Sequence, residues 1–280
     1  MKIRFLVCSI FTISFFSIKA QEKLYASVNV KTESTEKINF NETNINVSFN
    51  KKINSKITIS NQLEYANLKV NYDSGSFKNF ENLDQWNEIQ NTLGFLYDVS
   101  NKTKIKFYVT PTANFERTLD MSDLTVLGGF EINQQLIPST TIIIGAARTT
   151  AFGYPKYRPV LSLNYKINNS SNMLIGYPDS KISYSNNIRN QFVLSNSFNG
   201  NFYHLDSTNE LNNNASKAVL SQMTTAVEYE RNVDKNWFLN FKAGYDFDKK
   251  YNLIDTNNHT VYDFNTGKGY ILGIGIKYKQ

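Results

Sequence analysis

The chain has 280 residues, of which 41% are hydrophobic, 14% aromatic and 19% charged, and its formal net charge is +6. This composition is too polar for a membrane protein built from helices, and the charges form no basic stripe, which argues against nucleic acid as a partner. The only cysteine, Cys8, lies in the N-terminal segment described next, so the rest of the chain has no disulfide and no thiolate metal site.

The first twenty residues have the parts of a secretory signal peptide. Two basic residues, Lys2 and Arg4, precede an apolar stretch at 5–16, and small residues end the segment. We therefore expect residues 1–20 to be removed on export, which leaves residues 21–280 with a net charge of +3. No apolar run of about 18 residues follows, so no transmembrane helix is expected in the mature chain.

Six segments of the mature chain alternate apolar and polar residues with the period of a β-strand. In the segment 236–248, for example, Trp237 and Phe241 lie on one face while Asn240 and Lys242 lie on the other. A tilted strand crosses a membrane with about 9–11 residues, a length that these segments reach. In chain order they are 89–99, 104–115, 158–167, 217–231, 236–248 and 270–278.

Connections of two lengths alternate between the predicted strands. Short turns on the periplasmic side and long loops on the outside are typical of outer-membrane barrels, and they favour a barrel over a sandwich. Both chain ends are then expected in the periplasm. The short turns are 51–55, 100–103, 138–139, 168–172 and 234–236, and the longer connections are 73–87, 116–122, 206–215 and 255–266.

Three places interrupt the alternation. Between Tyr65 and Leu68 the apolar row moves to the other face, which predicts a β-bulge. Pro111 lies within a strand, where it either removes a ladder hydrogen bond or marks another bulge. Residues 176–179 predict a tight loop in a short hairpin, with one bent strand as the alternative. The two alternatives give fourteen or twelve strands.

An exported chain of amphipathic strands spans a bilayer only as a closed barrel, because lipid offers no hydrogen bonds to an open sheet edge. The predicted fold is therefore all-β: a transmembrane antiparallel up-and-down β-barrel of 14 strands, or 12 as the alternative, in the cell outer membrane. Outer-membrane lipid is the expected partner of the apolar faces. The sequence identifies no protein partner.

Two short blocks carry a resemblance to a known family. Residues 176–185, Gly-Tyr-Pro-Asp-Ser-Lys-Ile-Ser-Tyr-Ser, and residues 198–203, Phe-Asn-Gly-Asn-Phe-Tyr, resemble a family of outer-membrane β-barrels from Bacteroidota whose function is unknown. The resemblance implies a barrel in the cell envelope and brings no activity, cofactor or catalytic residue. The barrels that anchor gliding and type IX secretion machinery are a second candidate family, but their usual Asn-Pro-Ala-Tyr-Ala-Gly motif after the signal peptide is missing.

Candidate catalytic residues are few. His204 lies near Asp206 and Ser207, which are the residue types of a hydrolase triad. Residues this close in sequence rarely adopt triad geometry, which usually draws on separate elements. We therefore expect a solvated loop histidine and no enzyme.

The second histidine, His259, alternates with Asp255 and Asn257, so three ligands could face one side of an extended segment. A calcium loop of the EF-hand type needs a turn glycine and a closing glutamate, which this segment lacks. No cofactor or metal site is predicted, and a loosely held Ca²⁺ among loop carboxylates is the alternative.

The polar faces of the predicted strands carry charges of both signs. In a closed barrel these faces line the interior, where mixed charges indicate either a hydrated channel of low selectivity or a salt-bridged, closed interior. An inward-folding connection at 73–87, with Phe77, Phe80 and Trp86, would constrict the interior. The residues expected to line the lumen are Lys104, Lys106, Lys166, Glu228, Glu230, Lys242, Asp246 and Lys277.

The leading hypothesis for function is a structural or porin-like outer-membrane barrel that allows passive passage of small polar solutes. Pore radius and lumen charge would set selectivity, with no chemical step. One alternative is a binding or scaffold protein whose outside loops, with Trp86, Tyr154 and Tyr157, contact a glycan or a protein. A second alternative is an outer-membrane hydrolase that uses His204.

Overall fold

The computed structural model describes residues 23–73, 77, 80–206 and 215–280. The predicted signal peptide lies outside the described residues, as do parts of two predicted long connections, at 74–76, 78–79 and 207–214. Within the described part, no helix is long and apolar enough to cross a membrane.

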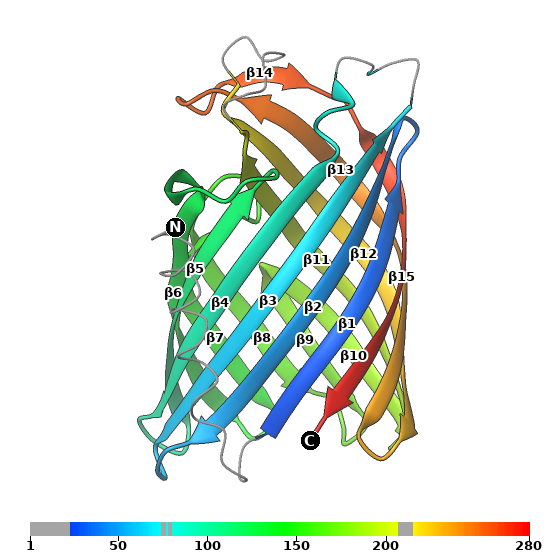
Figure 1. Cartoon of the computed structure of the whole chain (residues 1–280). Helices are drawn as coiled ribbons and strands as arrows, with labels where there is room; N and C mark the ends of the chain where they lie inside the picture. Colours follow the sequence, from blue (N-terminus) through cyan, green and yellow to red (C-terminus); the bar gives the residue numbers. More distant parts are fainter. Residues whose placement is uncertain (1–22, 74–76, 78–79, 207–214) are drawn as a thin grey trace.

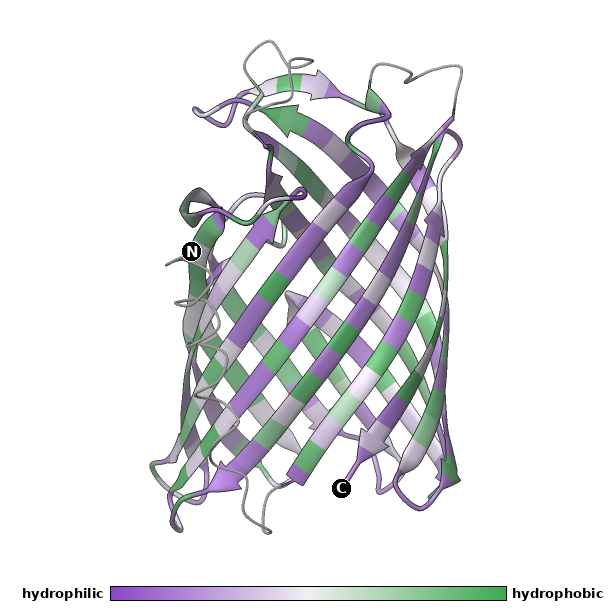
Figure 2. Ribbon diagram, viewed as in Figure 1, coloured by the Kyte–Doolittle hydropathy of each residue, from purple (hydrophilic) through white to green (hydrophobic). Residues whose placement is uncertain are grey.

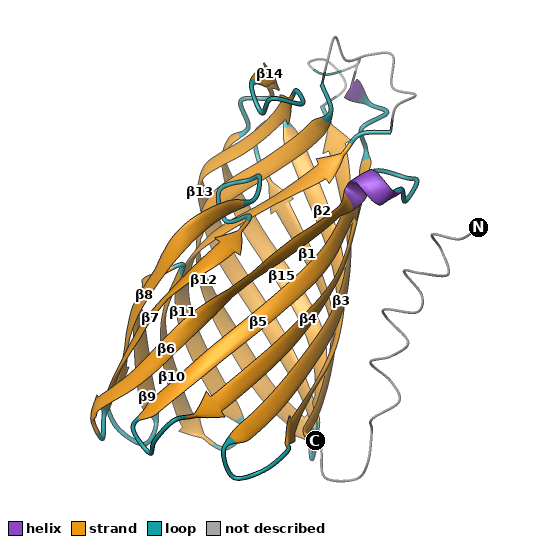
Figure 3. Ribbon diagram, turned by 90° about the vertical axis from the view of Figure 1, so that its left-hand side faces the viewer, coloured by secondary structure: helices purple, strands orange, loops and turns teal. Residues whose placement is uncertain are grey.

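Fourteen antiparallel strands form a closed barrel, which confirms the predicted fold and the higher of the two strand counts. Each strand pairs with the next along the chain, and the β1–β15 pairing closes the ring (Figures 1 and 3). The short strand β14 (Thr260–Asp263) pairs only with β13. The barrel strands are β1 (Lys23–Ser34), β2 (Ile38–Lys52), β3 (Ile57–Tyr72), β4 (Gln85–Asp98), β5 (Thr103–Phe115), β6 (Leu124–Ile137), β7 (Thr140–Thr149), β8 (Lys156–Lys166), β9 (Ser171–Tyr177), β10 (Asp179–Asn187), β11 (Asn190–His204), β12 (Lys217–Asp234), β13 (Trp237–Ile254) and β15 (Gly267–Lys279).

The two ends of the barrel differ. Short turns join the strands at one end, the turn end, where β1 begins and β15 ends. Longer connections lie at the opposite loop end. Apolar side chains such as Val28, Phe107 and Ile274 are exposed on the outer face, while their neighbours in sequence point inward. Figure 2 shows this alternation along the strands.

The structure decides two of the predicted interruptions of the alternation. The β2–β3 register runs unbroken past Tyr65 and Leu68, so the predicted bulge there is wrong. Leu68 instead points inward and is buried, because the interior itself becomes apolar at this level. Opposite Pro111 the β4–β5 register skips two positions without shifting, so the proline removes ladder pairing and makes no bulge.

A bulge that the sequence did not predict lies in β13. The register with β15 shifts between Asp246 and Lys249, the register with β12 shifts between Phe247 and Lys250, and Asp248 has a positive φ of 50°. An extra residue in a strand moves all later side chains to the opposite face. Lys249 and Tyr251 therefore point inward instead of outward.

The barrel narrows toward the loop end. The short hairpin of β9 and β10 ends at residue 178, as predicted, and the last position of β11 that pairs with β10 is Ser197. Strand β11 continues to His204, which pairs in parallel with Phe115 of β5. At this level β5 and β11 meet directly, so strands β6–β10 no longer contribute to the wall.

Candidate functional site: the barrel interior

The narrow loop end of the interior, here called the neck, is filled by buried side chains. The aromatic rings pack directly against one another: the centroids of Tyr251 and Phe264 lie 4.2 Å apart and those of Trp86 and Tyr203 5.3 Å apart. This part of the interior is packed like the core of a soluble protein. The neck residues are Ile38, Phe40, Leu68, Val70, Phe77, Leu83, Trp86, Tyr203, Ala218, Leu220, Tyr251, Leu253 and Phe264.

Connections at the loop end complete the neck. Phe77 and Leu83 come from the β3–β4 connection and Phe264 from the segment between β14 and β15, so the predicted inward constriction is observed for the described residues Phe77 and Leu83. Trp86 belongs to β4 itself and is completely buried, which excludes it as a contact for an outside glycan. Tyr157, by contrast, is exposed.

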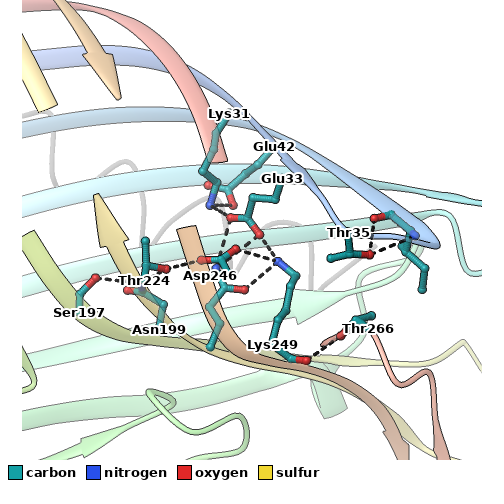
Figure 4. A network of polar contacts seen from close by, with 12 residues as sticks. Lys31, Glu33, Thr35, Glu42, Ser197, Asn199, Thr224, Asp246, Lys249 and Thr266 are labelled. Atoms are coloured by element: carbon teal, nitrogen blue, oxygen red, sulfur yellow. Dashed lines mark hydrogen bonds and ion pairs between the residues drawn. The ribbon is translucent and has the colours of Figure 1, made fainter. Parts of the chain in front are cut away.

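A buried network of charges lies beneath the neck (Figure 4). The Lys249 ammonium donates to Glu33 and, over 2.7 Å, to Oε1 of Gln222, and it lies 3.5 Å from Oδ2 of Asp246. Lys31 adds ion pairs of 2.7 Å to Glu33 and 2.9 Å to Glu42. The Lys249 and Glu33 side chains are only 1% and 5% exposed. Charges buried this deeply are tolerated because each has a partner of opposite sign.

The wider part of the interior toward the turn end, here called the chamber, contains most of the predicted lumen residues in separate ion pairs. Asp246 is the exception, since it belongs to the network beneath the neck. Lys166 lines a polar cavity of about 430 Å³ near the turn end. The pairs are Lys104 with Asp98 (3.5 Å), Lys106 with Glu131 (3.5 Å), Lys242 with Glu228 (3.0 Å), and Glu230 with Lys277 (3.0 Å) and Lys279.

Several interior charges were missed from the sequence, among them Lys31, Glu33, Glu88 and Lys249. Lys31 and Glu33 alternate with the exposed Val28 and Val30 row, a signal that was available in the sequence. Lys249 carried no such signal, because only the β13 bulge turns it inward.

Three cavities adjoin one another in the interior. The first, of about 330 Å³, is lined by residues that include Lys106, Glu131 and Arg158. It shares Tyr108 and Thr149 with a second cavity of about 270 Å³ at Glu88. The second shares Asn201 with a third cavity of about 70 Å³ beside Glu33 and Glu42. Cavities that each include charged side chains in their lining therefore extend from the chamber wall to the base of the neck.

The structure pairs His204 with a different acid from the one expected. Its Nδ1 lies 3.5 Å from Oδ1 of Asp123, in the 3-10 helix η3 (Met121–Asp123), without the geometry of a hydrogen bond. Burial raises the pKa of Asp123 to about 6. Ser207 lies outside the described residues. A triad needs its orienting acid hydrogen-bonded to the histidine, and this pair lacks that bond.

The segment with the second histidine forms a turn. The backbone N–H groups of Asn257 and His259 both donate to Oδ1 of Asp255 over 2.8 Å, and these bonds lower the pKa of Asp255. Within the described residues, no group of three or more acidic, histidine or cysteine side chains is arranged to hold a metal ion.

A family model described as a domain of unknown function, DUF6268, matches residues 16–279. The chain belongs to the DUF6268 family. No curated protein matches it.

Solved structures similar to this DUF6268 chain are barrels of low sequence identity. The NanC porin is 8% identical, covers 91% of this chain and 100% of its own, and has a TM-score of 0.45. A deltaS2 mutant of the TodX monoaromatic hydrocarbon channel is 10% identical, with coverages of 96% and 91% and a TM-score of 0.48. The translocator domain of autotransporter NalP from Neisseria meningitidis is 7% identical, with coverages of 99% and 95% and a TM-score of 0.41.

Proposed function

We propose that this DUF6268 protein is an outer-membrane barrel through which small polar solutes pass by diffusion, with the neck as a closed gate. Residues 1–20 direct its export, and the turn end faces the periplasm. We also propose that the family occurs in Bacteroidota.

Membrane insertion is supported by the two faces of the wall. The outer face exposes rows of large apolar side chains, such as Val28 and Val30 on β1 and Ile274 and Ile276 on β15. Contiguous apolar surface of this kind is costly in water, whereas a closed barrel satisfies its backbone hydrogen bonds within lipid. Mixed charges on the opposite face suit a water-filled interior.

The observation that carries the channel proposal is the series of adjoining cavities from Lys106 to Glu42, each with charged side chains in its lining. They provide a hydrated route as far as the neck. Passage beyond this point requires the aromatic packing around Trp86 and Tyr251 to loosen, because packed rings leave no space for water. Because the neck is packed, we expect a small conductance and infrequent openings.

The packed neck also supports a second function, a sealed barrel that serves as a binding or scaffold protein through its outside surface. Exposed Tyr157 at the start of β8 is then a contact residue. Tyr154 is less suited, since it packs against buried Phe202, Val219 and Ile254. The geometry of His204 does not support the hydrolase hypothesis.

Single-channel recording from refolded protein in planar bilayers separates these functions. We expect small, infrequent openings from the wild type and larger, longer ones from Trp86→Ala, which removes the largest side chain of the neck. Heat-modifiable gel migration checks that each variant is folded. Folded barrels that never conduct, with or without Trp86, would disprove the channel and favour the scaffold.

A further inference from the structure

The cavity of about 270 Å³ beneath the neck has the features of a binding site. Glu88 on β4 and Asn114 on β5 lie opposite each other in the strand register, and both side chains line this cavity. The volume is several times the roughly 30 Å³ that one water molecule occupies. A small solute can therefore fit together with water.

Both side chains are buried with an acceptor atom that has no partner. Glu88 is 7% exposed and Asn114 1% exposed. Oε2 of Glu88 and Oδ1 of Asn114 accept no hydrogen bond from any described residue. Leaving such an acceptor unsatisfied is costly, and more so when the group is charged. The pair is thus prepared to accept hydrogen bonds from something that enters the cavity.

The surroundings of Glu88 lack a compensating cation. Across the described residues, Glu88 makes no ion pair, and Glu64 on the neighbouring strand accepts only from amide side chains, including Asn46 (3.3 Å) and Gln62 (3.1 Å). Arg148 also lines the cavity, but its guanidinium donates to the backbone carbonyl of Val126. A buried carboxylate without a positive partner favours binding of a cation.

We propose that the cavity at Glu88 binds a small solute through an ammonium group. An ammonium has three donors and no acceptor, so it can satisfy Glu88 and Asn114 together and still donate to a hydroxyl. Thr110 and Thr112 supply hydroxyls in the same cavity. A neutral polyol would satisfy the acceptors, but only a cation compensates the charge that Glu88 carries when it is ionised. The inference rests on the proposed function in one respect, that solutes reach this cavity through the chamber.

Isothermal titration of refolded protein in detergent micelles with ethylammonium chloride tests the site. We expect saturable binding that Glu88→Gln weakens by about tenfold or more, the effect of losing a charged hydrogen bond. Asn114→Val should weaken binding by a smaller factor. Asp98→Asn is the matched control, because Asp98 lies outside the cavity and is paired with Lys104. It should leave the affinity unchanged, and gel migration verifies folding of each variant.

Three results would overturn the proposed site: no saturable binding by the wild type, equal binding by Glu88→Gln, or an equal loss in Asp98→Asn. Tighter binding of glycerol than of ethylammonium would also overturn it and would assign the cavity to polyols. The titration requires no transport. A barrel that binds ethylammonium but never conducts disproves the channel alone, whereas one that conducts without binding disproves the site alone.

Discussion

The neck and the chamber are built largely from the same strands, yet their interiors are opposite in character. On β3 the inward residues are Ser60 and Gln62 in the chamber and Leu68 and Val70 in the neck. In the neck, where β5 meets β11, side chains from facing walls touch and exclude water. In the chamber the wider ring leaves the inward residues facing water. The distance between facing walls, rather than the alternation along a strand, decides whether the interior is polar.

The largest expected effect comes from Trp86→Ala in the neck. Removing a fully buried aromatic side chain should lower the free energy of unfolding by about 3–5 kcal/mol, because the packed neck cannot collapse around the space. Tyr108→Ala in the chamber wall should cost about 1 kcal/mol. Urea titration of the barrel in lipid vesicles measures both. Equal losses would mean that the neck is not packed more tightly than the chamber.

Ion pairs in the two regions should also differ. Lys249→Met leaves buried Asp246 without an ion-pair partner among the described residues and leaves Glu33 with Lys31 alone, and it should cost about 3–5 kcal/mol. Lys242→Gln breaks a chamber pair whose side chains are 29% and 31% exposed, and should cost less than about 1 kcal/mol because solvent screens it. Urea titration of each variant in lipid vesicles measures its loss of unfolding free energy.

The double variant Lys249→Met/Glu33→Gln is the control for the neck pair. It should recover part of the stability that Lys249→Met loses, since it removes one of the two carboxylates that lie beside Lys249. A double variant less stable than the single one would show that the network contributes through packing instead of charge.

The outer and inner faces of one chamber strand give the next comparison. Phe241→Arg places a charge on the exposed outer face of β13 and should destabilise the barrel in vesicles by about 2–4 kcal/mol if the residue lies near the membrane centre. The adjacent Lys242→Gln faces inward and should cost far less. Equal effects would show that the outer face does not contact lipid.

The smallest effect on stability is expected for Lys106→Glu in the chamber. Its pair with Glu131 is partly exposed, so unfolding should change by less than about 1 kcal/mol. The reversal potential in a salt gradient should nevertheless shift toward cations, because wall charges set the field in a narrow pore. Lys37→Glu, an exposed change in the β1–β2 connection, should shift it less. An unchanged potential in Lys106→Glu would remove the chamber from the conduction path.

The sequence alone was sufficient to predict which residues of the barrel wall face outward and which face inward. In β15 the row Tyr270, Leu272 and Ile274 faces outward and Gly273 and Gly275 face inward, as their alternation indicates. The turn-end connections and the short hairpin at residue 178 also follow from local residues. Each of these features depends on neighbours in the chain or on a difference between the two faces of a strand. Because alternate residues point to opposite faces, the sequence of a strand shows such a difference directly.

Only the tertiary structure determined the neck and what lies beneath it. The change of face at Leu68 looks like a bulge in the sequence, although it marks the level at which the interior becomes dry. The real bulge in β13 leaves no such mark, because Tyr251 continues the sequence parity of outward Tyr245. Lys249 meets Glu33 across 216 residues of chain. These contacts depend on how closely distant strands approach when the ring closes, and alternation along one strand carries no information about that distance.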